Sequence, residues 1–177
     1  MSSSASRRVL ALALAGLVAV GATACTAQQE ASPSESAAAG VPVAIDCDTL
    51  ITPEALADYS PGFSLDDAYT PADGTEAAEV AKLDGLTCSW ANQASGVVIE
   101  VAVAQLPDAD LTALKNDFVT ESNSVPTYRV EGYFQLVDDS GQADAFDDPY
   151  WITASSTAFL EPGDAEAIIA AAIAGLG

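Results

Sequence analysis

The sequence contains no histidine among its 177 residues. Hydrolases of the Ser-His-Asp and Cys-His types need an imidazole to carry the proton, so both classes are excluded. A serine–lysine pair is no substitute, because no serine stands three positions before Lys82 or Lys115. A glycine-rich phosphate loop is also lacking, which argues against nucleotide use. We therefore expect a protein that is not an enzyme and that carries no cofactor.

Basic residues are scarce, with 5 lysines and arginines against 26 acidic residues. Arg7 and Arg8 lie in a segment that we expect to be removed, so the mature chain keeps only Lys82, Lys115 and Arg129. A field of this sign repels nucleic acid and anionic lipid headgroups. Binding to nucleic acid is thus excluded as a function, and the charge itself favours solubility and low self-association.

The chain has one long apolar run, residues 9–20, which is too short to span a bilayer comfortably. It follows Arg7 and Arg8 and precedes the small residues 22–24, a pattern typical of a signal peptide over residues 1–24. Cys25 comes next, and this arrangement resembles the lipobox of bacterial lipoproteins, in which the cysteine is diacylated before cleavage. An ordinary signal peptide followed by an unmodified cysteine is the alternative. We expect a lipid on Cys25 to hold the protein on the extracytoplasmic face of the cell membrane.

Residues 25–42 are small and polar with no aromatic side chain before Val43, so this stretch predicts a disordered tether. Residues 43–177 then have the size of a single globular domain. Two cysteines remain there, Cys47 and Cys88. In an oxidising compartment a disulfide is the default, with free thiols or a two-cysteine metal site as alternatives. A structural zinc site has too few good ligands, so no metal is expected.

The hydrophobic periodicity of residues 43–177 predicts an α+β fold. Helices are expected at residues 53–59, 75–83, 107–125 and 164–176. A hairpin is expected over residues 86–103 and a three-stranded meander over 132–158. Together these elements predict an antiparallel sheet of about five strands with helices packed on one face. Two stretches of strands that lead into a helix read alike, which allows a duplicated β-β-α unit.

Acidic side chains crowd the region of two successive predicted turns, where five aspartates occur: Asp138, Asp139, Asp144, Asp147 and Asp148. Oxygen ligands of this kind suit calcium, but an EF-hand loop starting at Asp139 would need glycine where Asp144 stands. The competing interpretation is that these are aspartate-rich hairpin turns facing solvent. Next to them, Tyr150 and Trp151 point to opposite faces of one expected strand, so one of the two is a candidate for exposure. We therefore count Trp151, together with the five aspartates, as a candidate binding residue.

Two short segments resemble a type of small actinobacterial lipoprotein whose domain has no assigned function. They are residues 47–54, CDTLITPE, and residues 88–90, CSW. The order of tether, cysteine, helix, Cys-x-Trp strand and alanine-rich last helix covers most of the mature chain. This resemblance implies a bridge between Cys47 and Cys88 and a Gram-positive envelope, and it brings no active site with it.

The sequence thus favours a non-catalytic, membrane-anchored lipoprotein that binds an envelope protein or a small molecule. The first alternative is a calcium- or carbohydrate-related function at the acidic hairpin region. The second is a carboxylate-based hydrolase, because two acids flanking a cleft suffice to cleave a glycoside.

Overall fold

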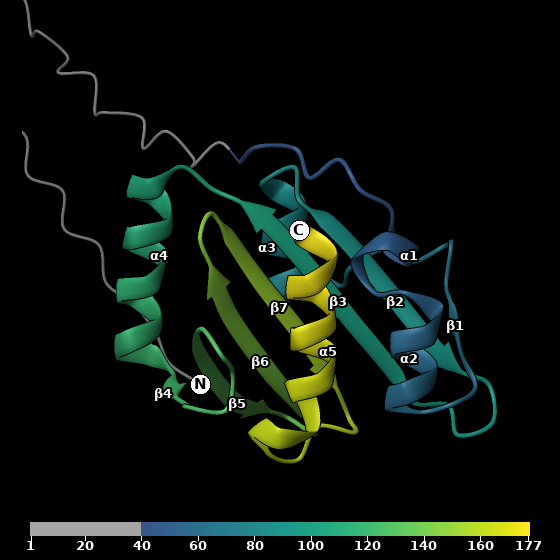
Figure 1. Ribbon diagram of the computed structural model, residues 1–177. Coiled ribbons are helices and arrows are strands. Elements are labelled where there is room, and N and C mark those ends of the chain that lie inside the picture. The colour runs from purple at the N-terminus through teal and green to yellow at the C-terminus, as the bar shows by residue number, and fades with distance from the viewer. Residues whose placement is uncertain (1–39) are drawn as a thin grey trace, which may run out of the picture. The chain divides into compact units, whose positions relative to one another are not determined.

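A computed structural model of the protein describes residues 40–177 (Figure 1). The expected signal peptide, Cys25 and nearly all of the tether lie outside the described residues. The elements, in chain order, are α1 (Cys47–Leu50), α2 (Pro53–Tyr59), β1 (Phe63–Leu65), α3 (Glu76–Lys82), β2 (Leu86–Asn92), β3 (Val98–Gln105), α4 (Asp108–Glu121), β4 (Asn123–Ser124), β5 (Glu131–Val137), β6 (Ser140–Asp147), β7 (Tyr150–Ser156) and α5 (Pro162–Leu176). Among these residues, no helix combines the length and the hydrophobicity needed to cross a bilayer.

Two of the helix starts follow directly from local sequence. The Thr52 hydroxyl accepts a hydrogen bond from the backbone N–H of Ala55, and Pro53 occupies the first turn of α2. The Thr75 hydroxyl caps α3 in the same way, accepting from the N–H of Ala78. Such caps satisfy backbone donors that have no partner within the helix. The predicted boundaries of these two helices are confirmed to within a residue.

The strands form one antiparallel sheet in the order β1-β2-β3-β7-β6-β5-β4. The predicted hairpin is β2 and β3, and the predicted meander is β5, β6 and β7. The sheet therefore has seven strands, not five, because a three-residue strand β1 and a two-residue strand β4 extend its edges. Strands this short carry too little pattern to be recognised in the sequence.

Helices cover both faces of the sheet, so the prediction of helices on one face is wrong. In Figure 1, α1, α2 and α5 lie in front of the sheet and α3 lies behind it. The front helices pack on a core that includes Trp90, Val101 and Ile152. On the other face, α3 and α4 pack on a second core, which includes Phe118 and Trp151. The physical reason is that β3 is apolar on both sides from Val101 to Ala104 and that Trp151 of β7 adds to its second side, which requires cover on both sides.

The duplicated β-β-α unit is not a symmetric repeat. The last strands of the two units, β3 and β7, are adjacent and antiparallel. A twofold axis can relate two such strands only if it is perpendicular to the sheet. That axis would place the helices that follow them, α4 and α5, on the same face of the sheet. Instead α4 packs with Phe118 on the second core, and α5 packs with Ile168 and Ile169 on the first. The resemblance between the two stretches is therefore confined to the local sequence.

A disulfide joins Cys47 of α1 to Cys88 of β2, as expected, across 41 residues of sequence. Cys88 and Trp90 are both buried in the first core, next to one another on the same side of β2. The bridge therefore ties the first helical turn of the described chain to β2, the strand next to the β1 edge of the sheet.

The opposite face of the sheet is approached closely by α3, because Gly85 leaves no side chain in the way. A Cβ atom at this position would lie 2.5 Å from the carbonyl oxygen of Val103 and 2.5 Å from a methyl group of Val80. Val80 is fully buried against β3. This contact fixes the position of α3, whose N-terminal end borders a cavity on the same face of the sheet.

Candidate functional site

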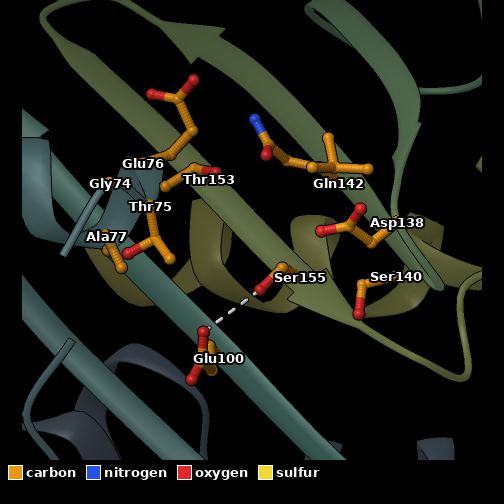
Figure 2. A pocket seen from close by; sticks show the side chains of 12 residues that line it. Gly74, Thr75, Glu76, Ala77, Glu100, Asp138, Ser140, Gln142, Thr153 and Ser155 are labelled. Carbon is orange, nitrogen blue, oxygen red and sulfur yellow. Dashed lines mark hydrogen bonds between the residues drawn. The ribbon is translucent and has the colours of Figure 1, made fainter. Parts of the chain in front are cut away.

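A cavity of about 260 Å³ opens on the α3 face of the sheet, between the N-terminal end of α3 and strands β3, β6 and β7 (Figure 2). We call it the polar cavity, because most of the residues that line it carry a hydroxyl, amide or carboxylate group. Its lining consists of Gly74, Thr75, Glu76, Ala77, Glu100, Ala102, Val137, Asp138, Ser140, Gln142, Thr153 and Ser155. Of these described residues, none is basic and none is aromatic.

The register of the sheet explains why polar side chains meet here. Glu100 of β3 pairs with Ser155 of β7, and Ser155 pairs with Gln142 of β6. Residues that are directly opposite in adjacent strands point to the same face. These three paired residues therefore present a carboxylate, a hydroxyl and an amide side by side across β3, β7 and β6. They lie on the same face of the sheet as the second core, which α3 and α4 cover.

Beside the cavity lies Asp144, a carboxyl group that is only 1 % exposed. Its two oxygens accept hydrogen bonds from the indole Nε1 of Trp151 at 3.0 Å and from the amide Nε2 of Gln142 at 3.1 Å. Burial raises the pKa of Asp144 to about 7, and the charge of Glu76 adds to this effect, while hydrogen bonds from Gln142, Trp151 and Thr153 oppose it. Since Gln142 also lines the cavity, its hydrogen bond links Asp144 to the cavity wall.

The carboxylate of Glu76 stands at the N-terminal end of α3. Burial raises its pKa, and the nearby charges of Glu79 and Glu121 raise it further, whereas a hydrogen bond with Gln142 lowers it. Gln142 donates to Asp144 and lines the cavity together with Glu76. The charge of Glu76 contributes to the raised pKa of Asp144, so the two acidic groups influence one another.

The opposite wall is formed by Glu100, whose Oε2 accepts a hydrogen bond of 3.3 Å from the Ser155 hydroxyl. Tyr69 lies close enough for burial and the Glu100 charge to raise the pKa of its phenol. The buried Tyr69 oxygen nevertheless completes no hydrogen bond within the described part of the chain. Tyr69 is not one of the residues that line the polar cavity, so its hydroxyl adds no group to this wall.

The acidic candidates from the sequence do not converge. Asp138 and Asp139 lie in the exposed β5–β6 turn, whereas Asp147 and Asp148 end β6 and begin the turn between β6 and β7. These turns are at opposite ends of the eight-residue strand β6, because successive turns of a meander alternate between the two edges. Within residues 40–177, no group of three or more acidic or cysteine side chains is placed to hold a metal ion.

The other candidate residues from the sequence occupy different environments in the fold. Asp144 lies within β6, not in a turn, and Trp151 is 2 % exposed, so both are core residues joined by a hydrogen bond. Tyr150 is the more exposed of the two neighbouring aromatics. Asp148 pairs with the ammonium group of Lys115. Only Asp138, of the six candidate residues, lines the polar cavity.

Sequence reasoning missed Glu76, Glu100, Gln142, Thr153 and Ser155. One signal could have indicated them. Glu100 interrupts the apolar run of β3, and Gln142 and Asp144 do the same in β6. A charged or amide side chain on an otherwise buried strand needs a partner or a purpose. The partners themselves depend on strand register, which the sequence does not display.

A wider groove of about 510 Å³ runs between α5 and the segment before β5. It is lined chiefly by alanine, valine and isoleucine side chains, together with Tyr128, Arg129 and Glu166. It offers few fixed hydrogen-bonding groups compared with the polar cavity. The polar cavity is therefore the better candidate for specific recognition of a small molecule.

The chemistry available in the polar cavity is that of carboxylates, hydroxyls and one amide. Such groups accept and donate hydrogen bonds and attract positive charge. None of the described lining residues supplies an imidazole or an ammonium group that could activate the hydroxyl of Ser140 or Ser155 as a nucleophile.

This chain matches no protein-family model, no curated protein and no solved structure. Its function is therefore inferred from its own residues.

Proposed function

We propose that this protein is a non-catalytic binding protein, anchored by a lipid on Cys25 to the extracytoplasmic face of the cell membrane, and that it binds a small molecule in the polar cavity. The signal-like residues 1–24 and the following cysteine support the location. The disulfide between Cys47 and Cys88 suits an oxidising compartment. The likeness of residues 47–54 and 88–90 to small actinobacterial lipoproteins agrees with both points.

The observation that carries the proposal is the polar cavity itself. Its hydrogen-bonding groups come from five separate segments, namely the start of α3, β3, β6, β7 and the β5–β6 turn, of which the first four pack on buried residues. A concave site with a few fixed polar groups is the usual form of a small-molecule site. A catalytic function has less support, because the lining has no imidazole or ammonium group beside its serines, and a sugar-cleaving function would gain no aromatic platform there.

Changing Cys25 to serine is expected to release the protein from the membrane. Only the thiol of Cys25 can form the thioether to diacylglycerol, and the chain to which it belongs is strongly acidic and would not bind anionic headgroups by charge. Detergent phase partitioning measures this directly: the parent protein should enter the detergent phase and Cys25→Ser should remain in the aqueous phase. If Cys25→Ser entered the detergent phase as fully as the parent, another anchor would have to hold the protein.

Filling the polar cavity is expected to abolish ligand binding without unfolding the protein. Ser155→Phe places a ring in the cavity from its β7 wall, and the matched change Ser64→Phe places the same ring at the exposed middle position of β1. The mature protein, purified in detergent, would be tested by thermal shift against sugars, polyols, amines, amino acids and carboxylic acids. A ligand present at 100 times its Kd should stabilise the parent and Ser64→Phe by about 2.7 kcal/mol.

The same ligand should leave the melting temperature of Ser155→Phe unchanged. If Ser155→Phe keeps the full shift, the ligand binds elsewhere and the polar cavity is not the site. Conversion of the ligand to a product during the titration would contradict the non-catalytic assignment and favour the carboxylate hydrolase.

A further inference from the structure

We infer that the polar cavity takes a small organic cation whose N–H groups donate hydrogen bonds, such as a protonated diamine. This inference rests on the proposed function and names the class of ligand. It is carried by three properties of the cavity: the hydrogen-bonding character of its walls, the separation of its carboxylates, and the acidic surroundings of Glu76.

The walls present acceptors, because several of their donors are already in use. The Ser155 hydroxyl donates its proton to Glu100, and Gln142 Nε2 donates to Asp144. A hydroxyl that donates its one proton has only lone pairs left to offer, and a carboxylate is purely an acceptor. The ligand must therefore supply donors. A protonated amine brings three, together with the charge that strengthens bonds to carboxylates.

Cationic character follows from the charges at the rim. The carboxylates of Glu76, Glu100 and Asp138 project from three sides in Figure 2, and all three residues line the cavity. The nearby ammonium groups of Lys82 and Lys115 are paired with Glu79 and Asp148 outside it. A cation in the cavity would relieve an accumulation of negative charge that the protein leaves uncompensated.

A polyatomic cation fits better than a metal ion. Calcium needs six to eight oxygens converging on one point. The described residues hold no group of three acidic side chains close enough to share an ion, and Glu76 and Glu100 stand on opposite sides of the cavity in Figure 2. A diamine can place one ammonium group near each carboxylate. At about 260 Å³, the cavity is small enough to select a short molecule of this kind.

The surroundings of Glu76 point the same way. Glu76 is partly buried beside two further acidic groups, Glu79 and Glu121, and its raised pKa reflects the cost of holding a charge there. An ammonium group at this position would favour the ionised form of Glu76.

Isothermal titration of the mature protein in detergent tests the inference with three probes at matched ionic strength. These are 1,4-diaminobutane, the neutral isostere butane-1,4-diol, and calcium chloride. We expect saturable binding of the diamine alone. Glu100→Gln should weaken it at least about tenfold, the loss that follows from removing one charge-assisted bond. Glu54→Gln makes the same substitution at an exposed position of α2, on the other face, and should leave the affinity unchanged.

Failure of the inference and failure of the proposed function give different results. If the diol binds as tightly as the diamine and Ser155→Phe abolishes its binding, the cavity is a binding site but the cationic class is wrong. Equal weakening by Glu54→Gln and Glu100→Gln would mean that the diamine responds to the overall charge and would overturn the inference. Calcium binding more tightly than the diamine, with the same loss in Glu100→Gln, would replace the organic cation by a metal ion.

Discussion

Replacing Asp144 with asparagine is expected to stabilise the protein by roughly 2 to 4 kcal/mol at pH 8, and to have progressively less effect as the pH falls toward 4. The folded protein holds this carboxyl in full burial, with a pKa raised from 3.8 to about 7 by burial first and by Glu76 second. Asparagine carries no charge, so it avoids the cost of ionising a buried group. Its side-chain oxygen can still accept the hydrogen bond from Trp151.

The direction of the pH dependence follows from where the proton resides. Between pH 4 and pH 7 the folded state keeps a proton on Asp144 that the unfolded state has released, so the free energy of unfolding of the parent falls as the pH rises through this interval. Asp144→Asn should lack this part of the decline. Urea unfolding at a series of pH values measures both curves.

A suitable control is Asp117→Asn, which makes the same change at an exposed position of α4. Its curve should run parallel to that of the parent. Should Asp144→Asn and the parent also run parallel, the buried carboxyl would be ionised throughout, and its pKa would not be raised by burial.

Loss of the disulfide is expected to lower the free energy of unfolding by an amount that does not depend on pH. The double change Cys47→Ala and Cys88→Ala removes a link across 41 residues of sequence. On the chain-entropy account, a loop of this length contributes about 4 kcal/mol by restricting the unfolded chain. For a domain of this size, the melting temperature should fall by about 10 °C or more. Calorimetry of the parent and the double variant in the absence of reductant measures the difference.

Reduction of the parent provides the companion measurement. With dithiothreitol, the parent should melt near the temperature of the double variant, whereas the double variant should not respond to reductant. If the double variant melted at the temperature of the unreduced parent, the bridge would not stabilise the fold.

Much of the secondary structure could be predicted because its causes are local. Thr52 and Thr75 cap helices through their own hydroxyls, and Pro53 suits the first turn by its fixed φ angle. The meander of β5, β6 and β7 follows from alternation interrupted by turn residues. Each of these signals acts within a few residues, so no knowledge of distant contacts is needed to interpret it.

The covering of the sheet could not be predicted in the same way. Alternation along β3 shows that both sides of the strand are apolar, with Ile99, Val101 and Val103 on one side and Ala102 and Ala104 on the other. It does not show which helix lies on which side. That choice depends on the path of the connections and on close approaches such as the one at Gly85, which involve residues far apart in sequence.

The candidate site shows the same limit more sharply. In the sequence, Asp138, Asp144 and Asp148 look like members of one acidic cluster. In the fold, Asp138 borders the polar cavity, Asp144 is buried beneath Gln142, and Asp148 pairs with Lys115 near the opposite end of β6. A strand rises about 3.3 Å per residue, so acids that are near in sequence separate quickly along it.

The sequence by itself determined the composition-level facts about this protein: no imidazole chemistry, a strongly acidic chain, a signal-like start before Cys25 and an even pair of cysteines in the remainder of the chain. It also determined the local elements, because capping, alternation and turn chemistry act over short distances. Only the tertiary structure decided that Glu76, Glu100 and Gln142 surround one cavity, and that Asp144 accepts from Trp151. These contacts depend on the register between strands and on the docking of α3, which are set by the burial of two cores at once, and not by any single segment.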